Sequence, residues 1–274
     1  MSYVDLHLHL LPGVDDGARD LRQSLEFSRR LVSEGVREVT ATPHVGAGLP
    51  YCPLSIPERV AALQRAINAE GIGLSVHTGG EIRPAGAPQL SDTELEVIAH
   101  GPQGSRWVLC EAPFEGIDEH FLEICGDLRR RGFAVLVAHP ERAEGLMNGG
   151  LSRLAPEIEA GALLQVNVCS LLGNHGAMAQ DAATALVRDG RAFVLASDAH
   201  PGSREHTLRL GFELALRAGV SSLHAWRLTQ GNPRFLLEHG IPPWPPRLTR
   251  AVWGPTDRRG HERSMPATWH PLYR

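Results

Sequence analysis

Seven short apolar runs, each separated from the next by a longer amphipathic segment, set the main constraint on how this chain can fold. A run that is apolar throughout and then breaks into a polar segment is typical of a strand buried on both faces. Alternation of such strands with helical segments predicts repeated βα units around a parallel sheet. The runs cover residues 4–9, 37–42, 73–79, 106–111, 134–138, 163–168 and 193–197, and helical periodicity covers residues 20–34, 56–70, 118–131, 176–189 and 205–218.

The polar side chains at the ends of these runs indicate a functional site. In a (β/α) barrel the carboxyl ends of the strands converge on one face, and that face carries the active site. We therefore expect eight ionisable side chains from six separated strands to meet in one pocket. They are His7, His9, His44, Glu81, Glu111, His139, Asp198 and His200, and Asn167 ends a further run.

Two pairs of these residues are spaced to bind a common ion. His7 and His9 stand two apart in a strand, so both side chains project from the same face. Asp198 and His200 repeat this spacing near the other end of the chain. Buried imidazoles and carboxylates are costly without a cation, and this combination suits divalent Zn, Mn, Fe or Ni. A glutamate that bridges histidine clusters further suits two or more metals.

Two aspartates and two arginines lie in loops beside these candidate ligands. Asp15 and Asp16 follow the first strand in a Gly-rich turn, and we interpret Asp15 as a turn former and Asp16 as part of the metal site. Arg142 and Arg204 each follow a candidate histidine by a few residues. Because arginine offers a planar fork of two donors to phosphate, both arginines are predicted to bind phosphate.

The composition excludes several other classes of function. The formal net charge is -4 at pH 7, whereas a nucleic-acid groove usually shows a basic excess. No stretch approaches the ~20 apolar residues that cross a bilayer, and the N-terminus lacks the pattern of a signal peptide. The four cysteines form no C-x-x-C pair, which favours buried thiols in a reducing compartment. We therefore expect a cytoplasmic protein that neither binds nucleic acid nor inserts into membranes.

The character of the sequence changes after residue 240. Residues 241–274 contain seven prolines, six arginines, two acidic residues and three of the five tryptophans. We predict one catalytic domain over residues 1–240 and a Pro/Arg/Trp-rich tail over residues 241–274. The tail is either mobile or an arm that docks through its tryptophans on the barrel or on a neighbouring subunit. The sequence assigns no oligomeric state.

Several motifs together resemble those of the polymerase and histidinol phosphatase (PHP) superfamily. They are DLHLHLLPGVDDGARDLRQSLEFSRRLVSEGVREVTATPH, GGEIR, AHPER, LLQVNVCSLLG, LASDAH and NPRFLL, and they occur in this order between residues 4 and 238. Within the superfamily, the pattern HxHxLPGxDDG resembles that of the bacterial manganese-dependent protein tyrosine phosphatases linked to capsular and exopolysaccharide synthesis.

That resemblance implies a fold, a metal centre and a partner. The fold is a distorted (β/α)7 TIM-like barrel of the α/β class. The site holds three divalent metals, with manganese first and iron, zinc or magnesium as alternatives. The partner is the phosphotyrosine tail of a bacterial tyrosine kinase that controls capsular or exopolysaccharide synthesis. The implied metal ligands are His7, His9, Asp16, His44, Glu81, Glu111, His139, Asp198 and His200, while Arg142 and Arg204 bind the phosphate and form the catalytic set with Asp198 and His200.

Two positions depart from the pattern of this branch. Val45 stands where the branch usually has a second histidine, and Ala143 stands where an aromatic residue usually follows the Glu-Arg pair. Neither departure removes an implied ligand. Both bear on how the leaving aryl group is protonated or packed, and therefore on substrate preference.

The predicted reaction is metal-assisted hydrolysis of a phosphomonoester, phosphotyrosine above all, without a covalent protein nucleophile. A histidinol phosphatase or another small-molecule phosphoesterase of the superfamily is the main alternative. A cysteine phosphatase is disfavoured because Cys125 and Arg131, which satisfy C-x5-R, fall in a helical segment. Amidohydrolases commonly bridge two metals with a carboxylated lysine, and this chain contains no lysine. A regulator that binds a phosphorylated tail without cleaving it is the non-enzymatic alternative.

Overall fold

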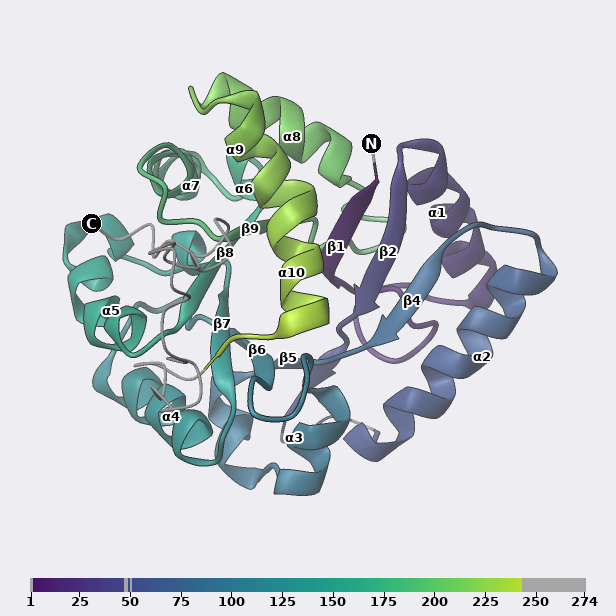
Figure 1. Ribbon diagram of the computed structural model, residues 1–274, viewed down its shortest axis with the longest axis horizontal. Coiled ribbons are helices and arrows are strands. Elements are labelled where there is room, and N and C mark those ends of the chain that lie inside the picture. The colour runs from purple at the N-terminus through teal and green to yellow at the C-terminus, as the bar shows by residue number, and fades with distance from the viewer. Residues whose placement is uncertain (1, 47–48, 50, 243–274) are drawn as a thin grey trace, which may run out of the picture.

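The computed structural model describes residues 2–46, 49 and 51–242. Seven main strands run parallel to one another, and amphipathic helices cover their outer side, as the alternation of runs predicts (Figure 1). Each predicted run forms a strand whose ends lie within a residue or two of the expected positions. The strands are β1 (Tyr3–Leu8), β2 (Val36–Ala41), β4 (Ser75–Thr78), β6 (Trp107–Glu111), β7 (Ala134–Ala138), β8 (Leu163–Asn167) and β9 (Val194–Ala196).

Two of the strands break and then resume, which the sequence analysis did not predict. After β2 the chain passes Pro43 and pairs again as β3 (His44–Val45), and after β4 it resumes as β5 (Glu81–Ile82). Proline lacks the N–H needed for continuous pairing. At the second break a Cβ on Gly79 would lie 2.4 Å from Cγ2 of Thr40, so only glycine fits. These breaks move the two short strands into a second sheet, ordered β3-β5-β6-β7-β8-β9.

Backbone hydrogen bonds join the first strand to the segment that follows the last one. Leu8 and Ala199 form a parallel bridge, and the His9 N–H donates to the Ala199 carbonyl at 2.9 Å. The Asp198 N–H likewise donates to the His7 carbonyl at 2.8 Å. The chain therefore closes on itself, and the predicted distorted (β/α)7 barrel is confirmed.

The amino-terminal end of the barrel is sealed by apolar side chains. Alternate strand residues point inward and pack on α10 (Asn232–His239), which lies across this end in Figure 1. The Trp107 Nε1–H donates to the Leu236 carbonyl at 3.0 Å. Ile241, which the sequence analysis placed in the tail, is buried here, whereas residues 243–274 of that tail lie outside the described residues. The inward-facing apolar set is Val4, Leu6, Trp107, Leu109, Leu136, Ala138, Val194, Leu236 and Ile241.

The helices confirm the predicted amphipathic segments and add shorter ones. Helices α3, α6 and α9 span only five to seven residues, too few to show a clear period, and Pro156 interrupts the pattern of α5. In the described part of the chain, no helix combines the length and apolar character needed to cross a membrane. The predicted helices are α1 (Leu21–Ser33), α2 (Ile56–Ala69), α4 (Glu119–Arg130), α7 (Ala177–Arg188) and α8 (Leu208–Arg217), and the added ones are α3 (Asp92–Ile98), α5 (Gly150–Glu159), α6 (Val168–Leu172), α9 (Ser222–Trp226) and α10.

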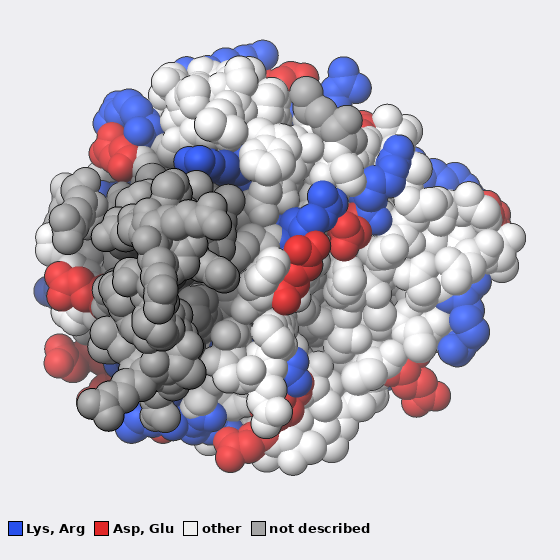
Figure 2. All heavy atoms as spheres, viewed as in Figure 1, with Lys and Arg blue, Asp and Glu red and all other residues white. Residues whose placement is uncertain are grey.

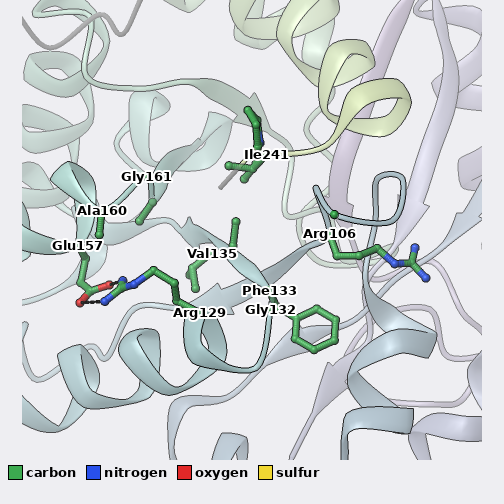
Figure 3. A pocket seen from close by; sticks show the side chains of 13 residues that line it. Arg106, Arg129, Gly132, Phe133, Val135, Glu157, Ala160, Gly161 and Ile241 are labelled. Carbon is green, nitrogen blue, oxygen red and sulfur yellow. Dashed lines mark hydrogen bonds and ion pairs between the residues drawn. The ribbon is translucent and has the colours of Figure 1, made fainter. Parts of the chain in front are cut away.

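The face that carries α10 shows acidic and basic side chains interspersed (Figure 2). A small pocket opens at this end of the barrel, where Phe133, Gly161 and Ile241 are among the lining residues (Figure 3). One acidic side chain lines it, that of Glu157, and this carboxylate is paired with Arg129. None of the predicted metal ligands lines this pocket. This pocket therefore lies apart from the predicted ligands.

A buried histidine makes the stability of the fold depend on pH. His100 exchanges two backbone hydrogen bonds with Trp107, and the centroids of the two rings lie 4.6 Å apart. Burial, with the neighbouring His77 and Arg106, lowers the pKa of His100 to about 3. Below its ordinary pKa near 6.5, the unfolded chain therefore binds a proton that the folded chain does not.

We expect the His100→Gln variant to lose less stability on acidification than the wild type. Between about pH 6.5 and 3 the difference in slope should approach 1.4 kcal/mol per pH unit, because only the wild-type unfolded state gains this proton. Urea unfolding at several pH values measures both slopes. Parallel curves would show that His100 is not held neutral in the folded protein.

Candidate metal centre

The carboxyl ends of the strands gather imidazoles and carboxylates into one cluster. Within four overlapping groups, nitrogen and oxygen atoms lie within 4.8 Å of one another. Every side chain that the sequence analysis proposed as a ligand belongs to at least one group. The groups are His9, Asp16, His44 and His200; His7, His9 and Asp198; His7, Glu81 and His139; and His44, Glu81 and Glu111.

The Glu81 carboxylate lies at the centre of the cluster and is almost fully buried. Its Oε2 lies 3.3 Å from Nε2 of both His7 and His9, and 3.1 Å from Nδ1 of His44. Its Oε1 lies 2.9 Å from Nε2 of His139. Burial opposes a charge at this position, but the surrounding imidazoles outweigh it and hold the pKa of Glu81 well below its ordinary range. Four histidines thus share one carboxylate.

His7 and His9 also face the carboxylate of Asp198. Its Oδ1 lies 3.5 Å from Nε2 of His7 and 3.4 Å from Nε2 of His9. Burial opposes protonation of His7, but the Glu81 and Asp198 carboxylates overcome it and raise the pKa of His7 to about 9. A metal ion that binds these nitrogens at neutral pH must therefore displace a proton.

The backbone is bent at two positions to direct side chains into the cluster. Among the described non-glycine residues, only His139 and Asp198 have positive φ, of 35° and 48°. This conformation costs roughly 1–2 kcal/mol for an ordinary residue, and such strain concentrates at functional sites. Both strained residues are predicted metal ligands: His139 directly follows β7, and Asp198 lies two residues after the end of β9.

Four buried ring nitrogens of the cluster form no hydrogen bond with the described residues, although those of His7, His9 and His44 face carboxylate oxygens at 3.1–3.5 Å. They are Nε2 of His7, Nε2 of His9, Nδ1 of His44 and Nδ1 of His139. Buried polar atoms without partners are rare and costly, whereas the free nitrogen of a neutral imidazole is a common ligand of divalent metals. The unpartnered nitrogens and neighbouring carboxylates therefore fit divalent cations such as Mn, Fe or Zn.

Asp16 lies at the open edge of the cluster, with its side chain 62% exposed. Its Oδ1 lies 3.3 Å from Nε2 of His200 and 3.6 Å from Nε2 of His44. The hydrogen bond to His200, together with the other nearby imidazoles, lowers the pKa of this carboxyl. Asp16 is therefore an anion at neutral pH, placed beside two candidate ligands.

Asp15 does more than form the turn that the sequence analysis assigned to it. Its Oδ1 accepts from the Gly17 N–H at 3.0 Å, as a turn former does. Its Oδ2, however, lies 2.7 Å from Nδ1 of His9 and accepts from the His44 N–H at 3.0 Å. A carboxylate on Nδ1 fixes the proton there and leaves Nε2 of His9 to face the cluster. The interpretation of Asp15 as a turn former alone was therefore incomplete.

A chain of amide side chains connects His7 to Asp198 below the cluster. Nδ1 of His7 lies 2.9 Å from Oε1 of Gln165, and Nε2 of Gln165 donates to Oδ1 of Asn167 at 2.7 Å. Nδ2 of Asn167 in turn donates to Oδ2 of Asp198 at 2.7 Å. Because an amide oxygen only accepts, it places the proton of His7 on Nδ1. Gln165 was not among the predicted site residues, although its spacing of two from Asn167 places both on one face of β8.

The two predicted phosphate-binding arginines lie on the rim of the cluster. Nη1 of Arg142 lies 3.4 Å from Oδ2 of Asp198, and Nη2 of Arg204 lies 3.6 Å from Oδ1 of the same carboxylate. Nη2 of Arg204 also lies 2.8 Å from Nδ1 of His200. Both side chains are partly exposed, so their remaining donors are accessible to an anion from solvent.

Glu111 is the most weakly held carboxylate of the cluster. Its Oε1 lies 3.8 Å from Nε2 of His139, and its side chain is largely buried. Burial and the neighbouring Glu81 carboxylate raise the pKa of Glu111 to about 7. A cation nearby favours the ionised form that a ligand needs.

The C-x5-R pattern of Cys125 and Arg131 offers no alternative nucleophile. Cys125 lies buried inside α4, as predicted, and burial raises the pKa of its thiol above the ordinary range. Arg131, six residues later, pairs with Asp92 at 2.7 Å rather than forming a phosphate loop. A thiol held neutral is a poor nucleophile. The C-x5-R pattern is therefore a coincidence of helix sequence.

Comparison with known proteins shows that this chain resembles tyrosine phosphatases. The family model described as "Capsular polysaccharide synthesis, CpsB/CapC" matches residues 3–236. The Bacillus subtilis (strain 168) protein named tyrosine-protein phosphatase YwqE is 31% identical over 198 residues, which cover 72% of this chain and 77% of that protein.

Two solved structures extend the comparison. The first has a TM-score of 0.75 and 29% identity. It belongs to a set described as crystal structures of YwqE from Bacillus subtilis and CpsB from Streptococcus pneumoniae, unique metal-dependent tyrosine phosphatases. That match covers 89% of this chain and 98% of the other. The Escherichia coli phosphotriesterase homology protein has a TM-score of 0.55 and 16% identity, over 84% of this chain and 97% of the other, and shows a shared fold alone.

The hydrogen bond from His9 to Asp15 predicts a loss of metal affinity when the carboxylate is neutralised. We expect Asp15→Asn to lower the affinity for Mn2+ roughly 10–100-fold, because partners of this kind orient the ligand and set its tautomer. Calorimetric titration of chelator-treated protein with Mn2+ measures the affinity. Asp189→Asn, which changes an exposed carboxylate paired with Arg188, is the matched control. Equal affinities for all three proteins would refute the role of Asp15.

Proposed function

This chain belongs to the CpsB/CapC family of capsular polysaccharide synthesis, and on that premise we propose that it is a metal-dependent protein tyrosine phosphatase. Its relative YwqE carries the name tyrosine-protein phosphatase. The substrate that we propose is a phosphotyrosine in the tail of a bacterial tyrosine kinase that controls capsular or exopolysaccharide synthesis. The free and mostly buried cysteines support action in a reducing compartment, the cytoplasm.

The observation that carries this proposal is the set of four unpartnered imidazole nitrogens bordered by two arginines. We propose three divalent ions, manganese by preference, as the occupants. Divalent ions bound there would polarise phosphoryl oxygens and make water a stronger nucleophile at neutral pH. The residues proposed to hold them are His7, His9, Asp16, His44, Glu81, Glu111, His139, Asp198 and His200.

The side chains of the rim bind and orient the phosphate group. Arg142 approaches Oδ2 of Asp198 and Arg204 approaches Oδ1, so both guanidinium groups lie beside the same carboxylate. Charge-assisted hydrogen bonds from both neutralise a phosphate dianion and fix its orientation. His9 and His7 keep their protons on Nδ1 through Asp15 and Gln165, which leaves Nε2 available as a ligand.

The first test is phosphate release from a phosphotyrosyl peptide by the manganese-loaded protein. We expect hydrolysis that chelation abolishes and that thiol alkylation leaves unchanged. His9→Ala should lower the rate by several orders of magnitude, because loss of one ligand misplaces a metal. Circular dichroism verifies that this variant is folded. Full activity after removal of all metal would exclude the proposed chemistry.

A substrate panel distinguishes the proposed activity from its main alternative. Histidinol phosphate and a phosphoserine peptide are assayed beside the phosphotyrosyl peptide under the same conditions. We expect phosphotyrosine to have the highest kcat/KM. Faster cleavage of histidinol phosphate would assign the protein to small-molecule phosphatases and remove the kinase from the proposal.

Removal of one rim arginine should weaken phosphate binding more than it slows hydrolysis of the bound substrate. We expect Arg204→Ala to raise KM for a phosphotyrosyl peptide roughly 10–100-fold, because hydrogen bonds to a charged group are worth about 1.5–3 kcal/mol. Arg209→Ala is the control, since that arginine is exposed on α8 and paired with Glu213. Steady-state kinetics separate KM from kcat. Unchanged constants for Arg204→Ala would show that this arginine does not bind the substrate.

A further inference from the structure

Phe114 stands out as an aromatic side chain that the fold leaves exposed beside the cluster. Among the Phe, Tyr and Trp residues that the structure describes, only Phe114 and Trp226 are exposed, at 44% and 45%. Trp226 ends α9 and packs over Gly231, on the chain segment that leads to α10. Phe114 instead lies three residues after Glu111, in the loop that follows β6 at the site.

The loop that carries Phe114 is fixed in place on the next loop of the barrel. The Phe114 carbonyl accepts from the Glu144 N–H at 2.8 Å. The Gly116 N–H donates to the Pro113 carbonyl at 3.2 Å, and Gly116 has a φ of 116°, which favours glycine. A Cβ at Gly116 would also lie 3.0 Å from the Glu144 carbonyl oxygen. The position of Phe114 is therefore built into the backbone.

The ring of Phe114 lies against one rim arginine and one candidate metal ligand. The guanidinium carbon of Arg142 lies 4.4 Å from the ring centroid, a cation–π contact. The His139 ring lies nearly parallel, with centroids 6.0 Å apart and planes at 22°. The exposed part of this ring therefore lies within reach of the ester substituent of a phosphate held by Arg142.

We propose that Phe114 determines the preference of the site for aryl over alkyl phosphate esters, by packing against the ring of the leaving group. The inference rests on the proposed function in that Arg142 must hold the phosphate. Ring pairs favour offset or edge-to-face contact and contribute beyond the apolar area they bury. Ala143, which directly follows Arg142, is buried and offers no ring. The aromatic surface comes from the β6 loop instead.

Two phosphonates test this role without any chemical step. Phenylphosphonate and methylphosphonate carry the same anionic group and have no ester bond to cleave. We expect the manganese-loaded wild type to bind phenylphosphonate about tenfold more tightly, as measured by calorimetry. Phe114→Ala should lose this preference, Phe114→Leu should lose most of it and Phe114→Tyr should keep it. Trp226→Ala, which removes the other exposed aromatic side chain, should bind both ligands as the wild type does.

The outcomes separate this inference from the proposed function. Equal binding of both phosphonates by the wild type, or an unchanged preference in Phe114→Ala, overturns the role of Phe114. An equal loss for both ligands in Phe114→Ala also overturns it, because the ring would then only position Arg142. If the protein prefers phenylphosphonate through Phe114 but hydrolyses no phosphotyrosine, the role of Phe114 stands and the proposed phosphatase activity is rejected. Failure to bind either phosphonate would reject both.

Discussion

The buried carboxylate of Glu81 is the constraint on which the site depends. An anion in the barrel interior needs positive charge close by, and four imidazoles provide its contacts here. Glu81 follows the strand break at Gly79, and the backbone has positive φ at His139, one of these four, and at Asp198, whose carboxylate faces His7 and His9. Local strain and an interrupted strand are therefore the structural cost of assembling one polar cluster.

The strands and the candidate ligands were predictable because both depend on local spacing. An apolar run followed by a polar residue places that residue at the end of a strand, and this located Glu111 and His139 correctly at strand ends that meet in the cluster. The amide chain was not predictable in this way. Gln165 meets His7 from 158 residues away, and only the order of strands around the barrel brings them together. The same holds for the contact between Asp15 and the His44 backbone.

Arg142, on the rim of the site, contacts both a carboxylate and an aromatic ring. Arg142 is held by the Asp198 carboxylate on one side and by the Phe114 ring on another. Its guanidinium is thereby oriented before any anion arrives, which lowers the entropy cost of binding. The departure at Ala143, seen first as a missing aromatic residue, is accompanied by a ring that another loop provides. An aromatic side chain can come from either of two neighbouring loops, because the loops that follow the strands lie at the same face of the barrel.

The apolar seal formed by Leu236 and Ile241 closes the barrel at the end away from the cluster. Among the described residues, no passage therefore leads along the barrel axis, and the cluster is reached from one end alone. Under the proposed chemistry, the phosphate freed in one turnover must leave by the route on which the next phosphotyrosine arrives. Release comes before the next capture, and accumulated inorganic phosphate competes directly with the substrate. Under that chemistry, dissociation of phosphate from the rim arginines is a required step of every cycle.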